Sequence, residues 1–594
     1  MSNKITLLIV LFAYCHAFAA TSTLTFTAKC NGSGTADDGA VWTVSSDGTE
    51  STYNSDKGIQ YKNKTGKNIS YLSITTDDIP GTITQVKVNA CGSQSSYACI
   101  QVSVGGTMFH WGNYTQAPLI TSPNDYIFTG SASGDIRVHL AQNPSQNSLY
   151  CKSIEVTYTA DMMVHDTETQ TISSPQTVEN LTIEAGGAVV LSDKKLTVNG
   201  DFVLHTTMGS GKSGQLTGAT STNFEVNGDA FIDITLGDNG NPAKWHAFTV
   251  PFPVDALLGI YDTDGTPLTN EVHYAIMDYH GDMRANGEYG WKKFTGTMSP
   301  GTFYLMTVDG SRTTYRMKAS GELLTAASKP FEYYTGSGAT TDYGWNGIGN
   351  PTLGYHKVDY PVQVLDPEHY VFETKPANSC NFVVGTPFFY QASADGSMSM
   401  LTADATAAYA PQRMNTAQQP QAAITFGNDD YTDCLYLSAS EDAGEFYEIG
   451  KDLEKMTMTT HPTVPQIAGL AYGTSLCMLH APLSDDEASF SLSLYAPTDG
   501  TYTIAAQDIS EAKVYLTEDG IVLQDITSQA AQLQLTQGPN NRYGIVLSVR
   551  SSSPTHMDET YSSKKAARKM LLRNQIWILR GGKLYDSTGK IVRQ

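Results

Sequence analysis

The chain has 594 residues, of which only 16% are charged, and it contains 52 glycines and 33 tyrosines. This length allows about three to five domains of ~100–200 residues, so the size of the hydrophobic core is not limiting. Few charges, many glycines and tyrosines, and abundant serine and threonine predict short strands joined by turns, which is an all-β fold. The net charge of −22 disfavours nucleic acid and anionic membranes as partners, because an acidic surface repels both.

The first twenty residues, 1–20, have the pattern of a secretory signal peptide. Lys4 precedes an apolar run from Ile5 to Tyr14, and small residues at positions 17 and 19 predict cleavage after Ala19 or Ala20. The apolar run is too short to span a bilayer, and no later segment offers about eighteen consecutive apolar residues. We therefore expect an exported protein without a transmembrane helix.

Residues 21–160 are predicted to form an antiparallel β-sandwich of jelly-roll type. Five segments alternate apolar with polar residues, and glycine and Asn/Ser turns separate them, as in sheets with one solvated face. These segments are Leu24–Ala28, Val86–Ala90, Ile100–Val104, Ile136–Leu140 and Ile154–Tyr158. Their order is similar to that of jelly-roll modules on secreted proteins of gut and oral Bacteroidetes, which resemble carbohydrate-binding or galactose-binding-like domains. This resemblance implies a glycan as a partner.

Aromatic residues of this first unit are candidates for stacking on sugar rings. The exposed set that we expect is Trp111, Phe109, His110 and Asn113, which fall in a turn-rich segment. The alternative is that aromatic residues fill the core, because six tryptophans in a chain of this length are easily buried.

Seven cysteines remain after removal of the signal peptide. In an oxidising compartment, Cys91 with Cys99 and Cys30 with Cys151 are the disulfides that we consider, although spacing alone does not fix the pairing. The other three have neither CxxC spacing nor neighbouring histidine pairs, so we expect buried residues rather than metal ligands. We expect no cofactor.

Residues 161–240 change character and are predicted to form a short β-solenoid that acts as a spacer. Apolar triplets recur with Gly or Asn between them, and Val198-Asn-Gly-Asp201 returns as Val226-Asn-Gly-Asp229. Short strands at regular spacing bury their apolar residues by stacking as rungs. Pectate-lyase-like enzymes also use β-helices, but they need many rungs and a cluster of Asp, Arg and Lys on one face, which this segment lacks.

Residues 241–425 and 426–550 are predicted to form two further β-sandwich regions. Aromatic and Gly/Pro-rich segments of the first follow one another as Trp245–Pro253, Ser299–Leu305, Trp345–Pro351 and Val384–Gln391. Segments of the second are Phe446–Leu453, Val464–Ile467, Gly500–Ile504, Val514–Leu516 and Asn541–Leu547. This order resembles that of large secreted Bacteroidetes surface proteins of the Prevotella and Bacteroides type, although Tyr543 stands where a phenylalanine is usual.

The C-terminal segment is predicted to be a basic linker, residues 551–575, followed by a β-hairpin unit, residues 576–594. From Lys564 onward, nine Lys and Arg residues accompany one acid, Asp586, whereas the preceding 563 residues carry 28 basic and 58 acidic residues. We expect the linker to be solvated rather than to bind anions.

The final residues, Lys583–Val592, alternate apolar and polar positions around a Ser-Thr-Gly turn. They resemble the C-terminal sorting signal of type IX secretion, in which a small β domain crosses the outer membrane last. The resemblance implies the secretion machinery as a partner and Tyr585, Gly589 and Val592 as the positions that are recognised.

Candidate catalytic and metal-binding patterns are weak. Asp262-Thr-Asp-Gly265 begins like a calcium loop but lacks a bidentate Glu at the twelfth position, so we expect a hairpin turn. His246, His273 and His280 lie close in sequence, but strand alternation does not direct them to one metal. No nucleophile elbow, HExxH or P-loop occurs in a fitting context. A hydrolase would need three or more carboxylates that converge on a deep pocket, which spacing does not exclude.

Together these patterns favour a secreted, surface-displayed, non-catalytic β protein that is adhesin-like or structural and carries a C-terminal export or attachment signal. The alternatives are an array of glycan-binding modules and, less favoured, a glycan-degrading hydrolase. The expected location is the cell surface, in association with the outer membrane. The expected ligand is a glycan or a host or bacterial surface component.

Overall fold

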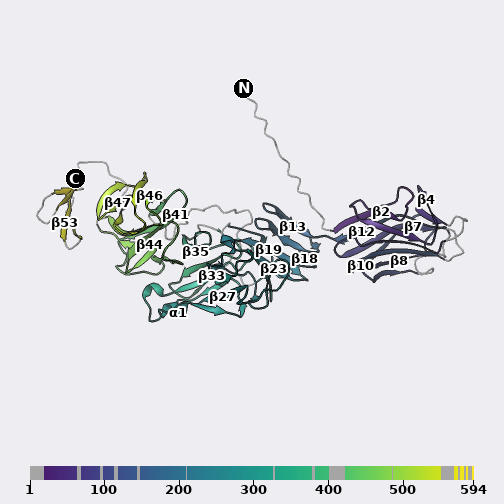
Figure 1. The fold of residues 1–594 in the computed structure, drawn as a ribbon, viewed down its shortest axis with the longest axis horizontal. Helices are drawn as coiled ribbons and strands as arrows, with labels where there is room; N and C mark the ends of the chain where they lie inside the picture. The colour runs from purple at the N-terminus through teal and green to yellow at the C-terminus, as the bar shows by residue number, and fades with distance from the viewer. Residues whose placement is uncertain are drawn as a thin grey trace, which may run out of the picture.

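The computed structural model describes residues 19–62, 69–93, 98–112, 118–142, 148–208, 211–324, 328–377, 381–399, 422–484, 486–510 and 512–549. It also describes the backbone of 568–572, 575–580, 583–585 and 591–593. The fold is all-β, as the composition predicts (Figure 1). Its helical segments among these residues are α1 Gly281–Ala285 and the 3-10 turns η1 Gly237–Gly240 and η2 Thr340–Asp342. No described helix is long and apolar enough to cross a membrane.

The N-terminal sandwich packs two antiparallel sheets face to face. One sheet has the order β10-β7-β12-β5-β4, with β1 paired to β12, and the other has the order β2-β3-β6-β11-β8-β9. The strands are β1 Ala19–Thr25, β2 Ser33–Thr35, β3 Val41–Ser46, β4 Glu50–Asn54, β5 Gly58–Lys62, β6 Tyr71–Thr76, β7 Ile83–Gly92, β8 Ala98–Val104, β9 Thr107–Trp111, β10 Asn124–Ala132, β11 Ile136–Gln142 and β12 Leu149–Thr159. Alternate residues, such as Ile136, Val138 and Leu140, are buried between the sheets.

The cysteines of this sandwich do not form the disulfides considered from the sequence. Cys30, Cys91, Cys99 and Cys151 are all free thiols and all buried. Cys91 and Cys99 flank the crossing from one sheet to the other, since β7 and β8 belong to different sheets. Burial raises the pKa of each of the four thiols, so they behave as small apolar core residues.

The solenoid consists of three short parallel sheets. Their orders are β13-β16-β19-β23, β14-β17-β21 and β15-β18-β22, with β20 paired to β19. The strands are β13 Met162–Val164, β14 Thr169–Ile172, β15 Gln176–Val178, β16 Leu181–Ile183, β17 Ala188–Leu191, β18 Leu196–Val198, β19 Phe202–Thr207, β20 Lys212–Ser213, β21 Gln215–Thr217, β22 Phe224–Val226 and β23 Ala230–Thr235. In register, Met162 lies beside Leu181, which lies beside Phe202, so equivalent apolar residues stack from rung to rung.

The last rung of the solenoid continues directly into the middle unit. Strand β23 pairs antiparallel with β31, and one apolar core extends from Met162 to residues beyond 350. Across this junction, Asp233, whose side chain is 1% exposed, accepts two hydrogen bonds of 2.8 Å from Arg316. The boundary expected near residue 240 therefore lies inside a continuous core.

The middle unit, residues 237–399, contains two four-stranded sheets, β24-β30-β27-β28 and β33-β38-β35-β36, with shorter pairs around them. Its strands are β24 His246–Phe248, β25 Val254–Asp255, β26 Ile260–Tyr261, β27 Tyr274–Tyr279, β28 Trp291–Phe294, β29 Thr297–Met298, β30 Tyr304–Val308, β31 Thr314–Lys318, β32 Ser328–Phe331, β33 Trp345–Gly349, β34 His356–Lys357, β35 Val362–Asp366, β36 Val371–Lys375, β37 Asn381–Phe382, β38 Pro387–Gln391 and β39 Gly396–Ser399. Aromatic rings fill the space between the sheets; Phe389 contacts the rings of Phe303 and Trp345.

The C-terminal sandwich, residues 422–549, is built from one twelve-stranded sheet that encloses its own core. Its strands are β40 Ala422–Gly427, β41 Thr432–Ser440, β42 Leu453–Glu454, β43 Gln466–Ala471, β44 Thr474–Pro482, β45 Glu487–Ala496, β46 Gly500–Gln507, β47 Ala512–Glu518, β48 Ile521–Asp525, β49 Ala531–Leu535, β50 Gly538–Asn540 and β51 Tyr543–Val549. Leu453 and Cys477 pack into the aromatic cluster of the middle unit, so the two units share an apolar contact.

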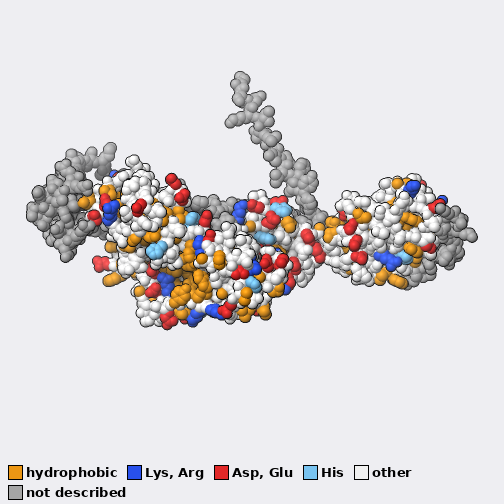
Figure 2. Space-filling model, in the orientation of Figure 1, with side chains coloured by type: hydrophobic (Ala, Val, Ile, Leu, Met, Phe, Trp, Pro, Cys, Tyr) orange, Lys and Arg blue, Asp and Glu red, His pale blue; other side chains and the backbone are white. Residues whose placement is uncertain are grey.

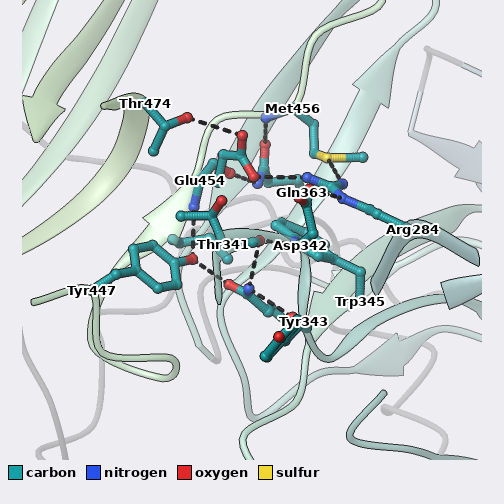
Figure 3. A network of polar contacts seen from close by, with 12 residues as sticks. Arg284, Thr341, Asp342, Tyr343, Trp345, Gln363, Tyr447, Glu454, Met456 and Thr474 are labelled. Atoms are coloured by element: carbon teal, nitrogen blue, oxygen red, sulfur yellow. Dashed lines mark hydrogen bonds and ion pairs between the residues drawn. The ribbon is translucent and has the colours of Figure 1, made fainter. Parts of the chain in front are cut away.

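A polar network reinforces this contact (Figure 3). Arg284 of the middle unit donates to Glu454 of the C-terminal sandwich at 2.7 Å and to Asp342 at 3.3 Å, and its guanidinium lies 4.6 Å from the centre of the Trp345 ring. Gln363 accepts from the backbone of Met456 at 2.7 Å and donates to the carbonyl of Glu454. Burial raises the pKa of the Glu454 carboxyl, which makes its pairing with Arg284 necessary for the charged form.

At the C-terminus, four strands form a small antiparallel sheet of order β52-β53-β54-β55. They are β52 Arg568–Leu572, β53 Gln575–Arg580, β54 Lys583–Tyr585 and β55 Ile591–Arg593. Strand β52 falls within the segment expected to be a linker, so this sheet begins before residue 576. Tyr585 and Val592 lie in β54 and β55, whereas Gly589 lies outside the described residues.

We expect the substitution Arg284→Ala to lower the free energy of unfolding by roughly 2–4 kcal/mol, because it leaves the Glu454 carboxylate with little compensation in a largely buried place. Urea unfolding of the full chain, followed by tryptophan fluorescence, measures this change. Lys293→Ala is the control, since Lys293 and Glu271 form an exposed ion pair worth less than about 1 kcal/mol. Equal effects of the two substitutions would contradict a stabilising role for the network.

Candidate functional site

The aromatic residues proposed from the sequence are divided between two sides of strand β9. Trp111 is 65% exposed and points to solvent. His110 turns inward, and its ring stacks on Phe128 with centroids 4.8 Å apart. Phe109 also packs inward, so close to Gly130 that a Cβ there would lie 2.5 Å from its ring. Asn113 lies outside the described residues.

A β-bulge explains this division. Opposite strand β8, Trp111 pairs with Gln101, His110 with Val102 and Met108 with Ser103, which leaves Phe109 as the extra residue. Because the bulge adds one residue to β9, the simple alternation of faces is broken at Phe109. Trp111 and Met108 therefore both lie on the solvent side of the sheet, with Met108 41% exposed.

Trp111 is the end of a row of side chains that crosses the outer face of the sheet β2-β3-β6-β11-β8-β9. The register pairs Ser45 with Ser73, Ser73 with His139, His139 with Gln101, and Gln101 with Trp111. Each residue belongs to a different strand, and neighbouring strands are about 4.8 Å apart, so the row is roughly 19 Å long. We call these five residues the cross-strand row.

A second row lies beside the first and adds a positive charge. In it, Arg137 pairs with Thr75 on β6 and with Ser103 on β8. The Arg137 guanidinium donates to Ser73 Oγ at 3.4 Å and contacts His139 Nδ1 at 3.3 Å. Tyr71 supplies a further ring, which stacks on the His139 imidazole at 5.6 Å.

Hydrogen bonds fix the orientation of these side chains. A guanidinium has donors but no acceptor, so His139 Nδ1 must accept and the neutral ring carries its proton on Nε2. Burial, and next the charge of Arg137, lower the pKa of His139, which favours this neutral form. At the end of the row, Gln101 Nε2 donates to the carbonyl of Gly112 at 3.1 Å and so holds the chain that follows Trp111.

A separate pocket of about 580 Å³ lies between the solenoid and the middle unit. Four carboxylates line it, those of Asp166, Asp366, Glu368 and Glu373. A hydrolase would need three or more carboxylates in one pocket, so their number is sufficient. Three of them already have partners, however: Asp166 pairs with Lys212 at 2.7 Å, Asp366 contacts the imidazole of His369 at 2.6 Å, and Glu373 pairs with Lys375 at 2.6 Å. Glycoside hydrolysis needs one protonated and one ionised carboxyl group across the substrate.

The loop Asp262–Gly265 closes a hairpin. The amide of Asp262 donates to the carbonyl of Thr266 at 2.8 Å, and the Asp262 carboxylate accepts from Arg312 at 3.2 Å. The carboxylate is therefore engaged with a cation of the protein itself.

The three histidines near this loop have separate partners. His246 contacts the carbonyl of Asn241 at 3.0 Å, His273 accepts from the amide of Thr269 at 2.8 Å, and His280 lies 3.2 Å from Asp278. Over the part of the chain that the structure describes, no three His, Cys, Asp or Glu residues form a group suited to a metal.

No protein-family model matches the chain, and no curated protein matches it. Among solved structures, it is similar to the CBM36-1 domain of a multidomain xylanase from the hindgut metagenome of Trinervitermes trinervoides, with 16% identity and a TM-score of 0.14, over 19% of this chain and 95% of that one. It is also similar to a xylan-binding module, CBM15, with 14% identity and a TM-score of 0.16, over 24% and 97% of the two chains. A third similarity is to the catalytic domain of a GH87 alpha-1,3-glucanase in complex with nigerose, with 8% identity and a TM-score of 0.13, over 32% and 50%.

We expect the N-terminal sandwich to lose stability as the pH falls below about 6.5, the ordinary pKa of histidine. The folded state holds the pKa of His139 below that of the unfolded chain, so on acidification the unfolded state takes up the proton first. Protonation also places a second cation beside Arg137. A titration of the His139 ring protons by NMR gives the pKa directly.

The control for this titration is His139→Gln, which is neutral at every pH. The wild type should lose more unfolding free energy than this variant between about pH 7 and about pH 5. An identical pH dependence of the two proteins would show that His139 is not the titrating group.

Proposed function

We propose that this protein is a non-catalytic, exported surface protein whose N-terminal sandwich binds a polysaccharide across the outer face of the sheet β2-β3-β6-β11-β8-β9. The observation that carries the proposal is the cross-strand row, with the exposed Trp111 at one end, Gln101 and His139 in line with it, and the exposed Ser45 at the other end. Ser73, between His139 and Ser45, is buried. The bound chain would lie across the strands rather than along them.

The chemistry of the row fits a sugar chain. The face of an indole ring packs against the C–H face of a pyranose, and its exposure means that it is available for such packing. Amide, imidazole and hydroxyl groups donate to and accept from sugar hydroxyls. The strand spacing of about 4.8 Å is comparable to the length of one pyranose residue, so successive strands can address successive sugars.

A protein partner fits this face less well. Protein interfaces are built around a central cluster of buried aromatic and apolar anchors. On this face, Trp111 and Met108 lie on the edge strand β9, and the strands beside it present polar side chains: Gln101, Ser103, Arg137 and His139.

The pairing of carboxylates supports a non-catalytic role. The two rows on the outer face contain no Asp or Glu, so they offer no acid and base for hydrolysis. In the pocket between the solenoid and the middle unit, Asp166 and Glu373 are each paired with a lysine, and Asp366 contacts the imidazole of His369. The solenoid and the two units after it then act as a stalk that carries the binding face.

Export is the remaining part of the proposal. The apolar segment Ile5–Tyr14 has the pattern of a secretion signal, and the small sheet β52-β55 contains the segment that resembles a sorting signal. The sheet is short and antiparallel, and Tyr585 pairs with both Ile578 and Ile591. Tyr585 therefore lies on β54, one of the two inner strands of this sheet.

We expect Trp111→Ala to weaken binding to a polysaccharide roughly tenfold or more, because removal of an aromatic anchor at a binding site costs at least about 1–2 kcal/mol. An array of plant, microbial and mucin glycans, probed with the labelled mature chain, identifies ligands, and titration calorimetry then compares the variants. Phe446→Ala is the matched control, because Phe446 is an aromatic residue that is 80% exposed on the C-terminal sandwich. Wild-type binding that survives Trp111→Ala would exclude this face as the site.

We expect a chain that lacks residues 576–594 to be retained inside the cell, while the intact chain reaches the surface. The deletion removes β54, β55 and all of β53 except Gln575, and so destroys the proposed sorting element. Cell fractionation and labelling of intact cells measure the location in a host that has a type IX system. The full-length Trp111→Ala variant serves as the control and should reach the surface; equal surface levels of the truncated chain would refute the sorting role.

A further inference from the structure

Arg137 differs from the other arginines of this protein. The structure describes the side chains of five arginines, and four of them hold carboxylates: Arg284 with Asp342 and Glu454, Arg312 with Asp262 and Asp309, Arg316 with Asp233, and Arg542 with Glu518. Among the described residues, no Asp or Glu lies within ion-pair distance of Arg137, although the whole chain has 59 acids and only 37 basic residues. Several described lysines of this sandwich, such as Lys29, Lys57 and Lys152, also have no carboxylate within ion-pair distance, so Arg137 is distinguished by its position as well as by the missing partner.

The position of Arg137 relates it to the proposed binding face. It is exposed on the outer face, two strands from Trp111 and in the neighbouring row. Its two side-chain contacts, Ser73 Oγ and His139 Nδ1, are neutral acceptors that orient the guanidinium without neutralising it. Since a guanidinium carries five N–H donors, these two contacts leave donors available to a ligand.

The surroundings permit an anion to approach. Residues 21–160 carry 8 basic and 10 acidic residues, a net charge of −2, whereas residues 161–563 carry 19 basic and 48 acidic residues, a net charge of −29. Figure 2 shows acidic side chains over both the N-terminal sandwich and the central units. At physiological salt the screening length is about 8 Å, so charges that lie farther than this from the outer face have little influence on a ligand held there.

We propose that the polysaccharide bound on this face is acidic, and that Arg137 binds an anionic group, a carboxylate or a sulfate, carried by a sugar next to the one that stacks on Trp111 or by the following sugar. This inference rests on the proposed function and names the class of its ligand. A planar guanidinium can donate two parallel hydrogen bonds to two oxygens of such a group. A neutral sugar hydroxyl has a single oxygen and cannot be bound in this way.

Nucleic acid is a worse match for the same cation. Its backbone presents a charge on every nucleotide and is held by several Lys and Arg residues at once. The cross-strand row and the row beside it contain one such residue, Arg137, so they suit a chain with occasional anionic groups.

The test uses pairs of probes with the same backbone and different charge. Hydroxyethyl cellulose is compared with carboxymethyl cellulose, and dextran with carboxymethyl dextran and dextran sulfate, at low and at high salt, with the full mature chain. We expect at least one anionic probe to bind about tenfold more tightly than its neutral partner, which corresponds to about 1.4 kcal/mol. High salt should reduce this difference, because the ion pair is exposed.

Three variants assign the preference to its residue. Arg137→Gln removes the charge, and we expect it to abolish the preference, so that for this variant an anionic probe binds no more tightly than its neutral partner. Lys87→Gln is the matched control: it removes one cation from strand β7, which belongs to the other sheet, and should leave the preference intact. Trp111→Ala should weaken binding of the neutral and the anionic probes alike.

The outcomes separate the two proposals. Binding of neutral probes that depends on Trp111, with no preference for anionic ones, overturns the role of Arg137 and leaves glycan binding in place. An anionic preference that survives Arg137→Gln also overturns it. A preference for the carboxymethylated probe indicates that the anionic group is a carboxylate, and a preference for the sulfated probe indicates a sulfate. Failure of every probe to bind overturns both proposals.

Discussion

The proposed binding face of this protein depends on the register of one β-ladder. Strand β11 pairs with β6 on one side and β8 on the other, and β8 pairs with β9. These three pairings bring His139, Gln101 and Trp111 into line. Because successive residues of a strand point to opposite faces, a slip of one residue would bury the polar groups and expose Val138 and Val102. The hydrophobic core of the sandwich therefore fixes which side chains form the proposed binding face, although the two lie on opposite sides of the sheet.

Behind this sandwich, the chain forms one continuous body from the solenoid to the C-terminal sandwich. Without a further strand, β23 of the last solenoid rung would leave a sheet edge with unpaired backbone groups, which is unfavourable. Strand β31 covers that edge, and the pair Asp233–Arg316 compensates the charge that the junction buries. The aromatic cluster around Phe389 and the Arg284 network then join the next two units. Both of these junctions combine an apolar contact with an ion pair.

The sequence predicted local features of this structure better than its long-range ones. Alternation in Ile136–Leu140 and Ile100–Val104 indicated which side chains face solvent, because a period of two residues is visible in any single strand. It did not indicate that His139 and Gln101 are neighbours, since their pairing joins segments almost forty residues apart. The β-bulge in β9 and the pairing of β23 with β31 were missed for the same reason. Charge counts also do not distinguish Arg137 from the other arginines. Its lack of a carboxylate partner is visible only in the structure, where the other arginines whose side chains are described each have one.

The connection between the N-terminal sandwich and the solenoid has a mechanical consequence. Glu179 of the solenoid accepts hydrogen bonds from the hydroxyl of Thr159 at 2.7 Å and from the amide of Thr82 at 3.2 Å, and its own amide donates to the carbonyl of Ala160. A few polar contacts open at a lower free energy than a buried core does. If the C-terminus is tethered and the sandwich holds a ligand, as we propose, tension along the chain would open this joint before it disrupts the core of either unit.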